Sequence, residues 1–301
     1  MIVNGEIEGL LVGHWTDIDA ATGCTVIRLP PQTVASGEVR GGAPATREFA
    51  LLDPTRLVSN VDAVVLCGGS TFGLRACDGV VDALRAEGVG FATSVGMVPI
   101  VVGMSLFDLG VGSPDSWPTA AAGSSAFAAA SSTASTGPVG AGTGATVNKW
   151  RGSQAATPGG VGIATLTEGD LTLTVIVAVN AAGEIDDGVT TAAVRDGTFR
   201  WSPPERFGET NTVIGVVATN ATLTKMECHL VAQGAHDGLA RAIAPPHMRS
   251  DGDAFVAAAT AEVDDVDVDH VRWLAVVATE QAIRSGVATL DSMPPSLDPS
   301  P

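Results

Sequence analysis

Two periodicities of apolar residues run along the chain, and each predicts a different kind of element. Buried strands are predicted where apolar residues are continuous or alternate, at residues 10–17, 23–29, 61–67, 160–166, 171–180, 212–219 and from 254 onward. Helices are predicted where apolar residues recur at helical spacing, at residues 71–87, 117–131, 223–243 and 271–287. Strands and helices are therefore interspersed, which is typical of an α/β or α+β fold.

Turn and capping residues define several of these boundaries. The turn at residues 168–170, Glu-Gly-Asp, joins two apolar runs and predicts a β-hairpin. Thr224 and Glu227 have the spacing of a capping box, which predicts the first turn of the helix that follows them. Residues 116–118, Ser-Trp-Pro, predict the start of helix 117–131, because proline favours the first helical position.

Polar and proline-containing segments set the limits of the folded unit. Residues 186–208 include Pro203 and Pro204 and predict an exposed connection. Residues 293–301 contain four prolines and predict a disordered tail. The remaining residues, 1–292, are expected to form a single domain, because a chain of this length buries a substantial core.

Composition narrows the class of protein and of partner. Of the 301 residues, 45% are hydrophobic, only 16% are charged and 36 are glycine, which indicates a compact, glycine-rich enzyme. The net charge of −17 argues against nucleic acid and against anionic membrane surfaces, since binding to phosphate needs a basic surface.

The chain is expected to work in the cytoplasm. Its N-terminus lacks the basic and apolar regions of a secretory signal, and its most apolar stretch, residues 95–109, is interrupted by Gly96, Pro99, Gly103 and Asp108. The four cysteines show no metal-ligand spacing and fit reduced thiols. No metal site is predicted.

A glycine-rich segment at residues 137–149 superficially resembles a phosphate-binding loop. It lacks the Gly-Lys-Ser/Thr ending of a P-loop, because Lys149 follows Asn148. No helical pattern follows it, as a dinucleotide fingerprint requires. We therefore predict no cofactor, and expect the glycines to let backbone pass close to a neighbouring chain or a substrate.

The junction Asn211-Thr212 is the candidate reactive point, because a polar turn meets an apolar strand there. Local propensity alone favours a turn residue followed by a β-branched strand residue. The alternative is that the chain cuts its own backbone at this bond. Thr212 would then carry a nucleophilic hydroxyl beside an α-amine, whose pKa of about 8 suits a base at physiological pH.

Four blocks support the second interpretation: residues 46–48 through 67–74, residues 140–146 with Lys149, the strand ending at Asn180, and residues 211–220 through 251–253. Together they resemble the DmpA/NylC family of self-processing hydrolases, which includes L-aminopeptidase/D-amidase/esterases, β-peptidyl aminopeptidases and 6-aminohexanoate-oligomer hydrolases. The resemblance spans roughly residues 8–290, nearly the whole chain.

The resemblance implies a four-layer αββα sandwich and a precursor cut into an α-chain, residues 1–211, and a β-chain, residues 212–301. The two chains are expected to stay associated and to form a homo-oligomer, often a tetramer in this family. The implied substrate is a small amide, peptide or oligoamide.

The family's functional residues fall on five positions of this chain. The nucleophile falls on Thr212, the lysine on Lys149, the active-site asparagine on Asn180, and two late carboxylates on Asp251 and Asp253. The side-chain N–H of Asn180 is the expected oxyanion donor. The lysine would keep the new amine neutral or donate to the hydroxyl, and the aspartates would orient the amine and the lysine.

One position departs from the family pattern. A tyrosine that helps to hold the oxyanion in some members falls on Phe107, whose ring has no hydrogen-bond donor. Phe107 is therefore expected in the substrate pocket, and the departure puts the substrate class in doubt more than the mechanism.

Two other functions remain open. One is an acyltransferase of the ornithine acetyltransferase type, which resembles this family in fold and in threonine self-cleavage. The other is a non-catalytic protein that keeps the fold and is never processed.

Overall fold

A computed structural model of the chain describes residues 2–3, 7–201 and 211–287. The predicted tail 293–301 and the prolines Pro203 and Pro204 lie outside the described residues.

One five-stranded sheet is built mainly from the second half of the chain. Its strands, in spatial order, are β13 (Gly160–Glu168), β14 (Leu171–Asn180), β16 (Thr212–Ala221), β18 (Ala254–Val263) and β4 (Val34–Val39). The pair β16–β18 is parallel and the other pairs are antiparallel. The β13–β14 hairpin confirms the turn predicted at residues 168–170.

The other five-stranded sheet comes from the first third of the chain. Its strands, in spatial order, are β2 (Leu11–Asp17), β3 (Thr22–Arg28), β6 (Ala63–Cys67), β9 (Val101–Ser105) and β5 (Ala45–Arg47). Here the pair β6–β9 is parallel and the other pairs are antiparallel.

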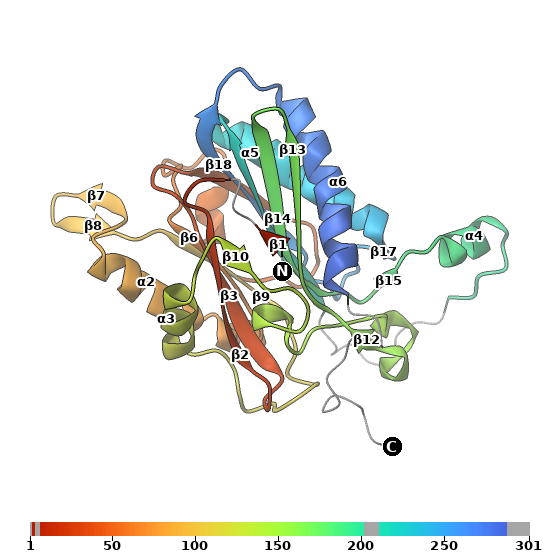
Figure 1. Cartoon of the computed structure of the whole chain (residues 1–301). Coiled ribbons are helices and arrows are strands. Elements are labelled where there is room, and N and C mark those ends of the chain that lie inside the picture. Colours follow the sequence, from red (N-terminus) through yellow and green to blue (C-terminus); the bar gives the residue numbers. More distant parts are fainter. Residues whose placement is uncertain (1, 4–6, 202–210, 288–301) are drawn as a thin grey trace.

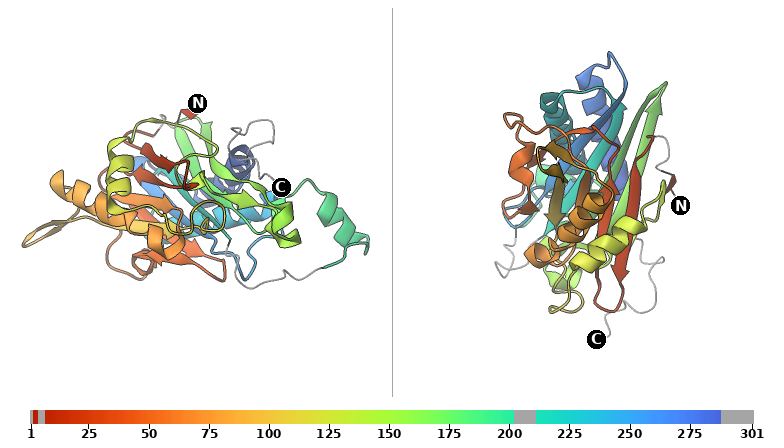
Figure 2. Two further views of the ribbon diagram at one scale, coloured as in Figure 1. Left: turned by 90° about the horizontal axis from the view of Figure 1, so that it is seen from below. Right: turned by 90° about the vertical axis from the view of Figure 1, so that its left-hand side faces the viewer.

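The two sheets face each other, and a pair of helices covers the outer face of each (Figure 1 and Figure 2). Helices α5 (Lys225–Ala242) and α6 (Val268–Gly286) pack on the β14 sheet, and α2 (Ala76–Ala86) and α3 (Ala120–Ala128) pack on the β3 sheet. Three apolar cores separate the four layers. This arrangement confirms the predicted αββα sandwich.

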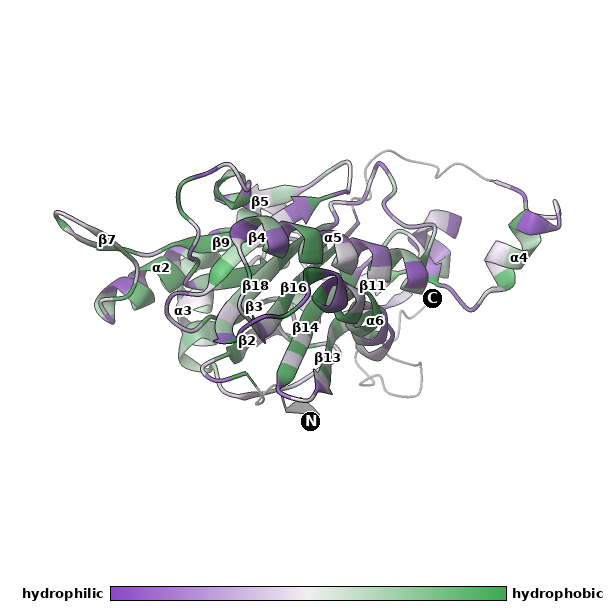
Figure 3. Ribbon diagram, turned by 90° about the horizontal axis from the view of Figure 1, so that it is seen from above, coloured by the Kyte–Doolittle hydropathy of each residue, from purple (hydrophilic) through white to green (hydrophobic). Residues whose placement is uncertain are grey.

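Strand β14 shows why the central strands read as continuous apolar runs. Val175, Val177 and Val179 belong to the core beneath α5 and α6, whereas Ile176 and Ala178 belong to the core between the sheets. A strand buried on both faces needs apolar residues at every position. Each fully buried aliphatic side chain stabilises the fold by roughly 1.5–3 kcal/mol. Hydrophobic colouring follows these inner strands in Figure 3.

Short elements complete the described fold. Four two-stranded pairs are β1 (Ile2–Val3) with β10 (Thr133–Ala134), β7 (Phe91–Thr93) with β8 (Gly96–Val98), β11 (Thr146–Val147) with β12 (Thr157–Pro158), and β15 (Glu184–Ile185) with β17 (Ile243–Ala244). The 3-10 turns are η1 (Phe49–Leu52), η2 (Gly140–Gly142), η3 (Lys149–Arg151) and η4 (Ser153–Ala155).

Several predicted boundaries were wrong. Helix α3 lies within the predicted range 117–131, but its start was wrongly placed at residues 116–118: it begins at Ala120, because the hydroxyl of Thr119 caps it by accepting the Ala122 N–H. The helix expected at 71–87 is split into α1 (Ser70–Gly73) and α2. The connection expected at 186–208 contains helix α4 (Val189–Arg195), which projects from the body in Figure 1. Strands β4, β5 and β9 were not predicted.

Other boundaries agree with the prediction. Thr224 and Glu227 form both hydrogen bonds of the capping box at the start of α5.

No helix within residues 2–3, 7–201 and 211–287 combines the length and the apolar character that crossing a bilayer requires.

Candidate active site

The pairing of β14 with β16 places the candidate nucleophile. In this antiparallel ladder Asn180, the last residue of β14, lies opposite Thr212, the first residue of β16. Both residues are buried, Thr212 with 3% of its surface exposed and Asn180 with none. The sheet therefore sets two predicted site residues side by side, although 31 residues separate them in sequence.

The carbonyl of Asn211 is held on two sides. The Thr212 hydroxyl donates a hydrogen bond to this carbonyl oxygen, and the backbone N–H of Gly252 donates another at 2.7 Å. The N–H of Asn211 in turn donates to the carbonyl of Ser250 at 3.0 Å, so that Asn211 pairs with Asp251 in a short parallel bridge. The peptide bond predicted to be cut is thus fixed against the loop before β18.

The two late carboxylates lie on that same loop and accept backbone N–H groups. Asp253 Oδ1 accepts the Val213 N–H at 2.8 Å, and Asp253 Oδ2 pairs with His247 Nδ1 at 2.8 Å. Asp251 accepts the N–H of Ala182 at 3.1 Å and the N–H of Met248 at 2.7 Å. His247 was not predicted, because only the fold brings its ring to Asp253.

The environment of Asp251 favours its neutral form. Burial raises the pKa of Asp251 to about 7, and the neighbouring charge of Asp253 acts in the same direction. The two backbone N–H groups and the charge of Lys149 act in the opposite direction. A carboxyl with this pKa exchanges protons readily near neutral pH.

Lys149 reaches the site through Asn180. Its Nζ donates to Asn180 Oδ1 at 2.7 Å and to the Asn180 carbonyl oxygen at 3.3 Å. Its backbone is anchored on either side, where the N–H of Asn148 donates to Gly183 O at 2.8 Å and the N–H of Trp150 donates to Ala182 O at 2.9 Å. The segment after β14, at Ala182 and Gly183, therefore holds the backbone on both sides of the lysine.

The glycines before Lys149 allow close approach between backbones of the same chain. A Cβ at Gly142 would lie 2.3 Å from Val161 N, and one at Gly144 would lie 1.9 Å from Ala21 O. Such separations exclude any side chain at these positions. The residues of this segment thus pack against the body of the protein.

The side-chain amide of Asn180 has a defined orientation. Its Oδ1 accepts from Thr146 N at 2.9 Å as well as from Lys149, and its Nδ2 donates to the carbonyl oxygen of Phe107 at 3.0 Å. An amide nitrogen carries two hydrogens, and the bond to Phe107 uses one of them. Phe107 itself is half-buried and meets the site through its carbonyl.

A third buried carboxylate, Asp108, was missed by the sequence analysis. Its Oδ1 accepts the Gly69 N–H at 2.7 Å and its Oδ2 accepts the Thr22 hydroxyl at 2.8 Å. Burial raises the pKa of Asp108, and the positive charge of Lys149 opposes that shift. A Cβ at Gly68 would lie 2.0 Å from Asp108 Oδ2, which explains the Gly68-Gly69 pair: the loop wraps closely around this carboxylate.

All the predicted site residues therefore meet in one region. Thr212, Asn180 and Lys149 form a chain of neighbours, and Asp251 and Asp253 lie on the loop that holds the Asn211 carbonyl. Their catalytic roles stay predictions. Gly252, His247 and Asp108 join them, and the only sequence signal for these three was their place beside residues already selected.

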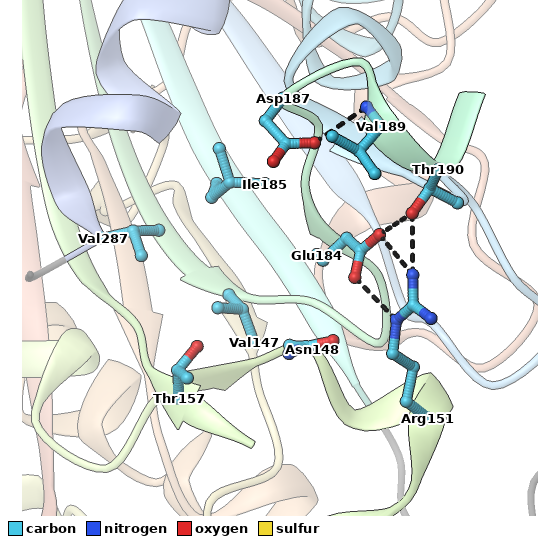
Figure 4. Close-up of a pocket in the computed structure, with 10 residues that line it drawn as sticks. All are labelled: Val147, Asn148, Arg151, Thr157, Glu184, Ile185, Asp187, Val189, Thr190 and Val287. Carbon is cyan, nitrogen blue, oxygen red and sulfur yellow. Dashed lines mark hydrogen bonds and ion pairs between the residues drawn. The ribbon is translucent and has the colours of Figure 1, made fainter. Parts of the chain in front are cut away.

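The cavity in Figure 4 lies beside this region, with a volume of about 370 Å³. Arg151 points toward Glu184 there and binds both of its carboxylate oxygens at 2.9 Å, while Thr190 contacts both residues. None of the residues predicted for catalysis, all of which the structure describes, lines this cavity. The cavity is connected to the predicted catalytic residues through Asn148, which lines the cavity and directly precedes Lys149 in the chain.

Relatives of known class share most of the chain. An uncharacterized aminopeptidase of Mycobacterium leprae (strain TN) is 40% identical, over 86% of this chain and 78% of its own length. The 6-aminohexanoate-oligomer endohydrolase of Paenarthrobacter ureafaciens is 28% identical, over 86% of this chain and 75% of its own length.

Solved structures share the fold. A β-aminopeptidase of Burkholderia sp. superposes with a TM-score of 0.69 at 22% identity, covering 94% of this chain and 85% of that one. The L-aminopeptidase D-Ala-esterase/amidase of Ochrobactrum anthropi, described as a variant of the Ntn hydrolase fold, gives a TM-score of 0.70 at 19% identity, with the same coverage.

The sequence pattern of peptidase family S58 matches residues 5–295. The chain therefore belongs to peptidase family S58 and is a hydrolase of amide or peptide bonds.

Proposed function

We propose that this chain is a self-processing amide hydrolase of the aminopeptidase or amidase type, cut at Asn211-Thr212, with Thr212 as its nucleophile. The observation that supports this most strongly is the contact of the Thr212 hydroxyl with the Asn211 carbonyl, in a buried position and with a backbone donor on the same oxygen. A hydroxyl that is hydrogen-bonded to the oxygen of this carbonyl lies close to the carbon that it must attack.

Processing then takes two steps, an acyl shift to the hydroxyl and hydrolysis of the ester. Thr212 Oγ adds to the Asn211 carbonyl carbon, the C–N bond breaks, and the hydroxyl proton passes to the departing nitrogen, which becomes the α-amine of Thr212. The resulting Asn211 ester is hydrolysed by water, which leaves a carboxylate on Asn211 and restores the hydroxyl.

Substrate hydrolysis repeats this chemistry on another amide. The free α-amine of Thr212 takes the hydroxyl proton as Oγ attacks the substrate carbonyl, and delivers it to the leaving amine. Water then hydrolyses the acyl ester. Asn180, oriented by Lys149, Thr146 and Phe107, offers its second Nδ2 hydrogen to the oxyanion.

The two products of cleavage remain together in this proposal. Strand β14 belongs to the α-chain, residues 1–211, and β16 begins the β-chain, residues 212–301, yet the two strands pair along eight positions at the centre of one sheet. Separating the chains would expose strands that are buried throughout. Cleavage therefore changes the chemistry of residue 212 and keeps the fold.

The substrate we propose is a small peptide or oligoamide, by analogy with the relatives named aminopeptidase and 6-aminohexanoate-oligomer endohydrolase. The family resemblance also leads us to propose a homo-oligomer, a tetramer in the first instance. We place it in the cytoplasm, where its four cysteines, all buried and free of disulfides, stay reduced.

Mass spectrometry and N-terminal sequencing of the purified protein test the proposal. We expect a fragment that begins Thr-Val-Ile-Gly, together with release of amine from peptide and oligoamide substrates. A chain that hydrolyses amides while its 211–212 bond is intact would refute the mechanism. Acyl transfer from acetylornithine to glutamate, without net hydrolysis, would assign the acyltransferase function instead.

A further inference from the structure

We propose that the backbone N–H of Gly252 is the oxyanion donor of this site, first for self-cleavage and then for the substrate. The inference rests on the proposed function and adds a catalytic group to it. Gly252 lies between the two carboxylates selected from the sequence, and it has no side chain that could have marked it.

The donor already touches the reacting atom. Gly252 N lies 2.7 Å from the carbonyl oxygen of Asn211, the oxygen that becomes negative when Thr212 Oγ adds to the carbonyl carbon. An N–H at this distance gains strength as charge develops on its acceptor. It therefore stabilises the tetrahedral intermediate more than the intact peptide bond.

The loop around Gly252 is fixed on both sides, so the donor is preorganised. The carbonyl of Asp251 accepts the Ala43 N–H at 2.8 Å, and the carbonyl of Asp253 accepts the Arg40 N–H at 3.0 Å. The Asp253 carboxylate holds Val213 N, one residue after the nucleophile, at 2.8 Å. These bonds tie the loop to the segment that follows β4 and to β16, so the N–H needs no reorientation during reaction.

The position also explains why residue 252 is glycine. A Cβ there would lie 2.8 Å from Thr212 Oγ1 and 2.7 Å from Ala43 O. Only glycine lets the backbone come this close to the nucleophile while its N–H points at the neighbouring carbonyl.

The same donor serves the substrate because the same oxygen attacks. After cleavage, the acyl carbonyl of a substrate must reach Thr212 Oγ, in the space that the Asn211 carbonyl leaves. Its oxygen then faces Gly252 N–H. The ring of Phe107 has no hydrogen-bond donor, and its carbonyl accepts from Asn180. We therefore assign Gly252 N–H and Asn180 Nδ2 to the oxyanion as its pair of donors.

A matched pair of variants tests the assignment. Gly252→Ala and Gly252→Pro both add a Cβ that crowds Thr212, but only proline lacks the N–H. We expect the alanine variant to process more slowly than wild type on a denaturing gel. We expect the proline variant to be slower than the alanine variant by about 10²–10³-fold, the usual effect of losing one oxyanion donor. Equal rates for the two variants would overturn the proposal.

Because the proline ring also fills the place of the hydrogen, a second measurement uses the wild-type sequence. A peptide aldehyde is trapped on the processed protein as a hemiacetal of Thr212, and the crystal structure of that adduct is determined. A hemiacetal oxygen within hydrogen-bonding distance of Gly252 N supports the assignment, and an oxygen that points away from it refutes it. A wild-type chain that is never cut at 211–212 would instead refute the proposed function, and Gly252's role with it.

Discussion

The two facing sheets are built alike but contribute to the site from opposite strand ends. Each contains one parallel pair, β16–β18 in one sheet and β6–β9 in the other. In the first sheet the site residues start or precede the parallel strands, with Thr212 on β16 and Asp253 just before β18. In the second they follow the strands, with Gly69 after β6 and Asp108 after β9.

The two sheet edges supply different kinds of groups to the site. The β16–β18 edge supplies the hydroxyl, the peptide bond that it contacts, and the Gly252 N–H. The β6–β9 edge supplies the Phe107 carbonyl and the Asp108 carboxylate, which lie around Asn180 and Lys149. We infer that one sheet performs the reaction and the other orients the groups that assist it.

The largest effect is expected for the hydroxyl itself. Thr212→Ala should abolish both processing and amide hydrolysis, because it removes the hydroxyl that attacks the carbonyl in both reactions. A denaturing gel and an amine-release assay measure the two activities, and Thr212→Ser, which keeps a hydroxyl, is the matched control. Residual hydrolysis by the alanine variant would show that the reaction does not depend on this edge.

Asn180 joins the two edges and should rank second. Asn180→Ala removes the contacts to Lys149, Thr146 and Phe107 together with the proposed second donor. We expect kcat to fall by about 10²–10³-fold, as for the loss of one oxyanion donor, while the chain stays folded. The comparison of kcat with KM decides the point, because a rise in KM alone would indicate a role in substrate binding only.

Substitutions of Asp108 test whether the β6–β9 edge only orients Asn180 and Lys149 or also takes part in the reaction. Asp108→Asn keeps an acceptor for the Gly69 N–H, and the Thr22 hydroxyl can turn to accept from the new amide. The rate of hydrolysis should therefore stay within about tenfold of wild type. Loss of a general acid or base would lower the rate by about 10²-fold or more. If this variant melts normally but is inactive, the second sheet takes part in the chemistry.

Asp108→Ala tests the structural role of this carboxylate through the free energy of unfolding. It leaves the buried Gly69 N–H without its acceptor and should lower the free energy of unfolding by roughly 1–3 kcal/mol. Urea unfolding of this variant beside Asp108→Asn measures the difference, and equal stability of the two would contradict the structural role.

The last prediction concerns the pH dependence of stability and leaves catalysis aside. Burial raises the pKa of Asp251 to about 7 from the usual 3.8, so between these values the folded chain holds a proton that the unfolded chain releases. The contribution of Asp251 to the free energy of unfolding therefore falls as pH rises through this window and is constant above it.

Because other carboxyls titrate in the same range, the quantity to measure is the difference in free energy of unfolding between wild type and Asp251→Asn. Urea unfolding at a series of pH values should show wild type losing stability relative to the variant as pH rises. A difference that grows in the other direction would mean that Asp251 is ionised throughout.

The local sequence pattern was sufficient to predict an element when contacts between its own neighbouring residues determine it. The hairpin β13–β14 follows from two apolar runs around a short turn, and the start of α5 follows from Thr224 and Glu227, three positions apart. Strand β9 was missed because its residues lie in an apolar stretch with glycines, and only its pairing with β6 and β5 makes it a strand.

The sequence by itself determined the strands β14 and β16, which carry Asn180 and Thr212, and, through the family resemblance, five candidate catalytic positions. Only the tertiary structure decided that Gly252 N–H meets the Asn211 carbonyl, that His247 pairs with Asp253, and that Asp108 lies within the field of Lys149. The physical reason is that periodicity and capping report contacts between near neighbours in the chain. The Gly252 contact forms only when β16 pairs with β18, the His247 contact depends on the path of the loop before β18, and Asp108 meets Lys149 only when the two sheets pack. A backbone N–H looks the same at every residue until then.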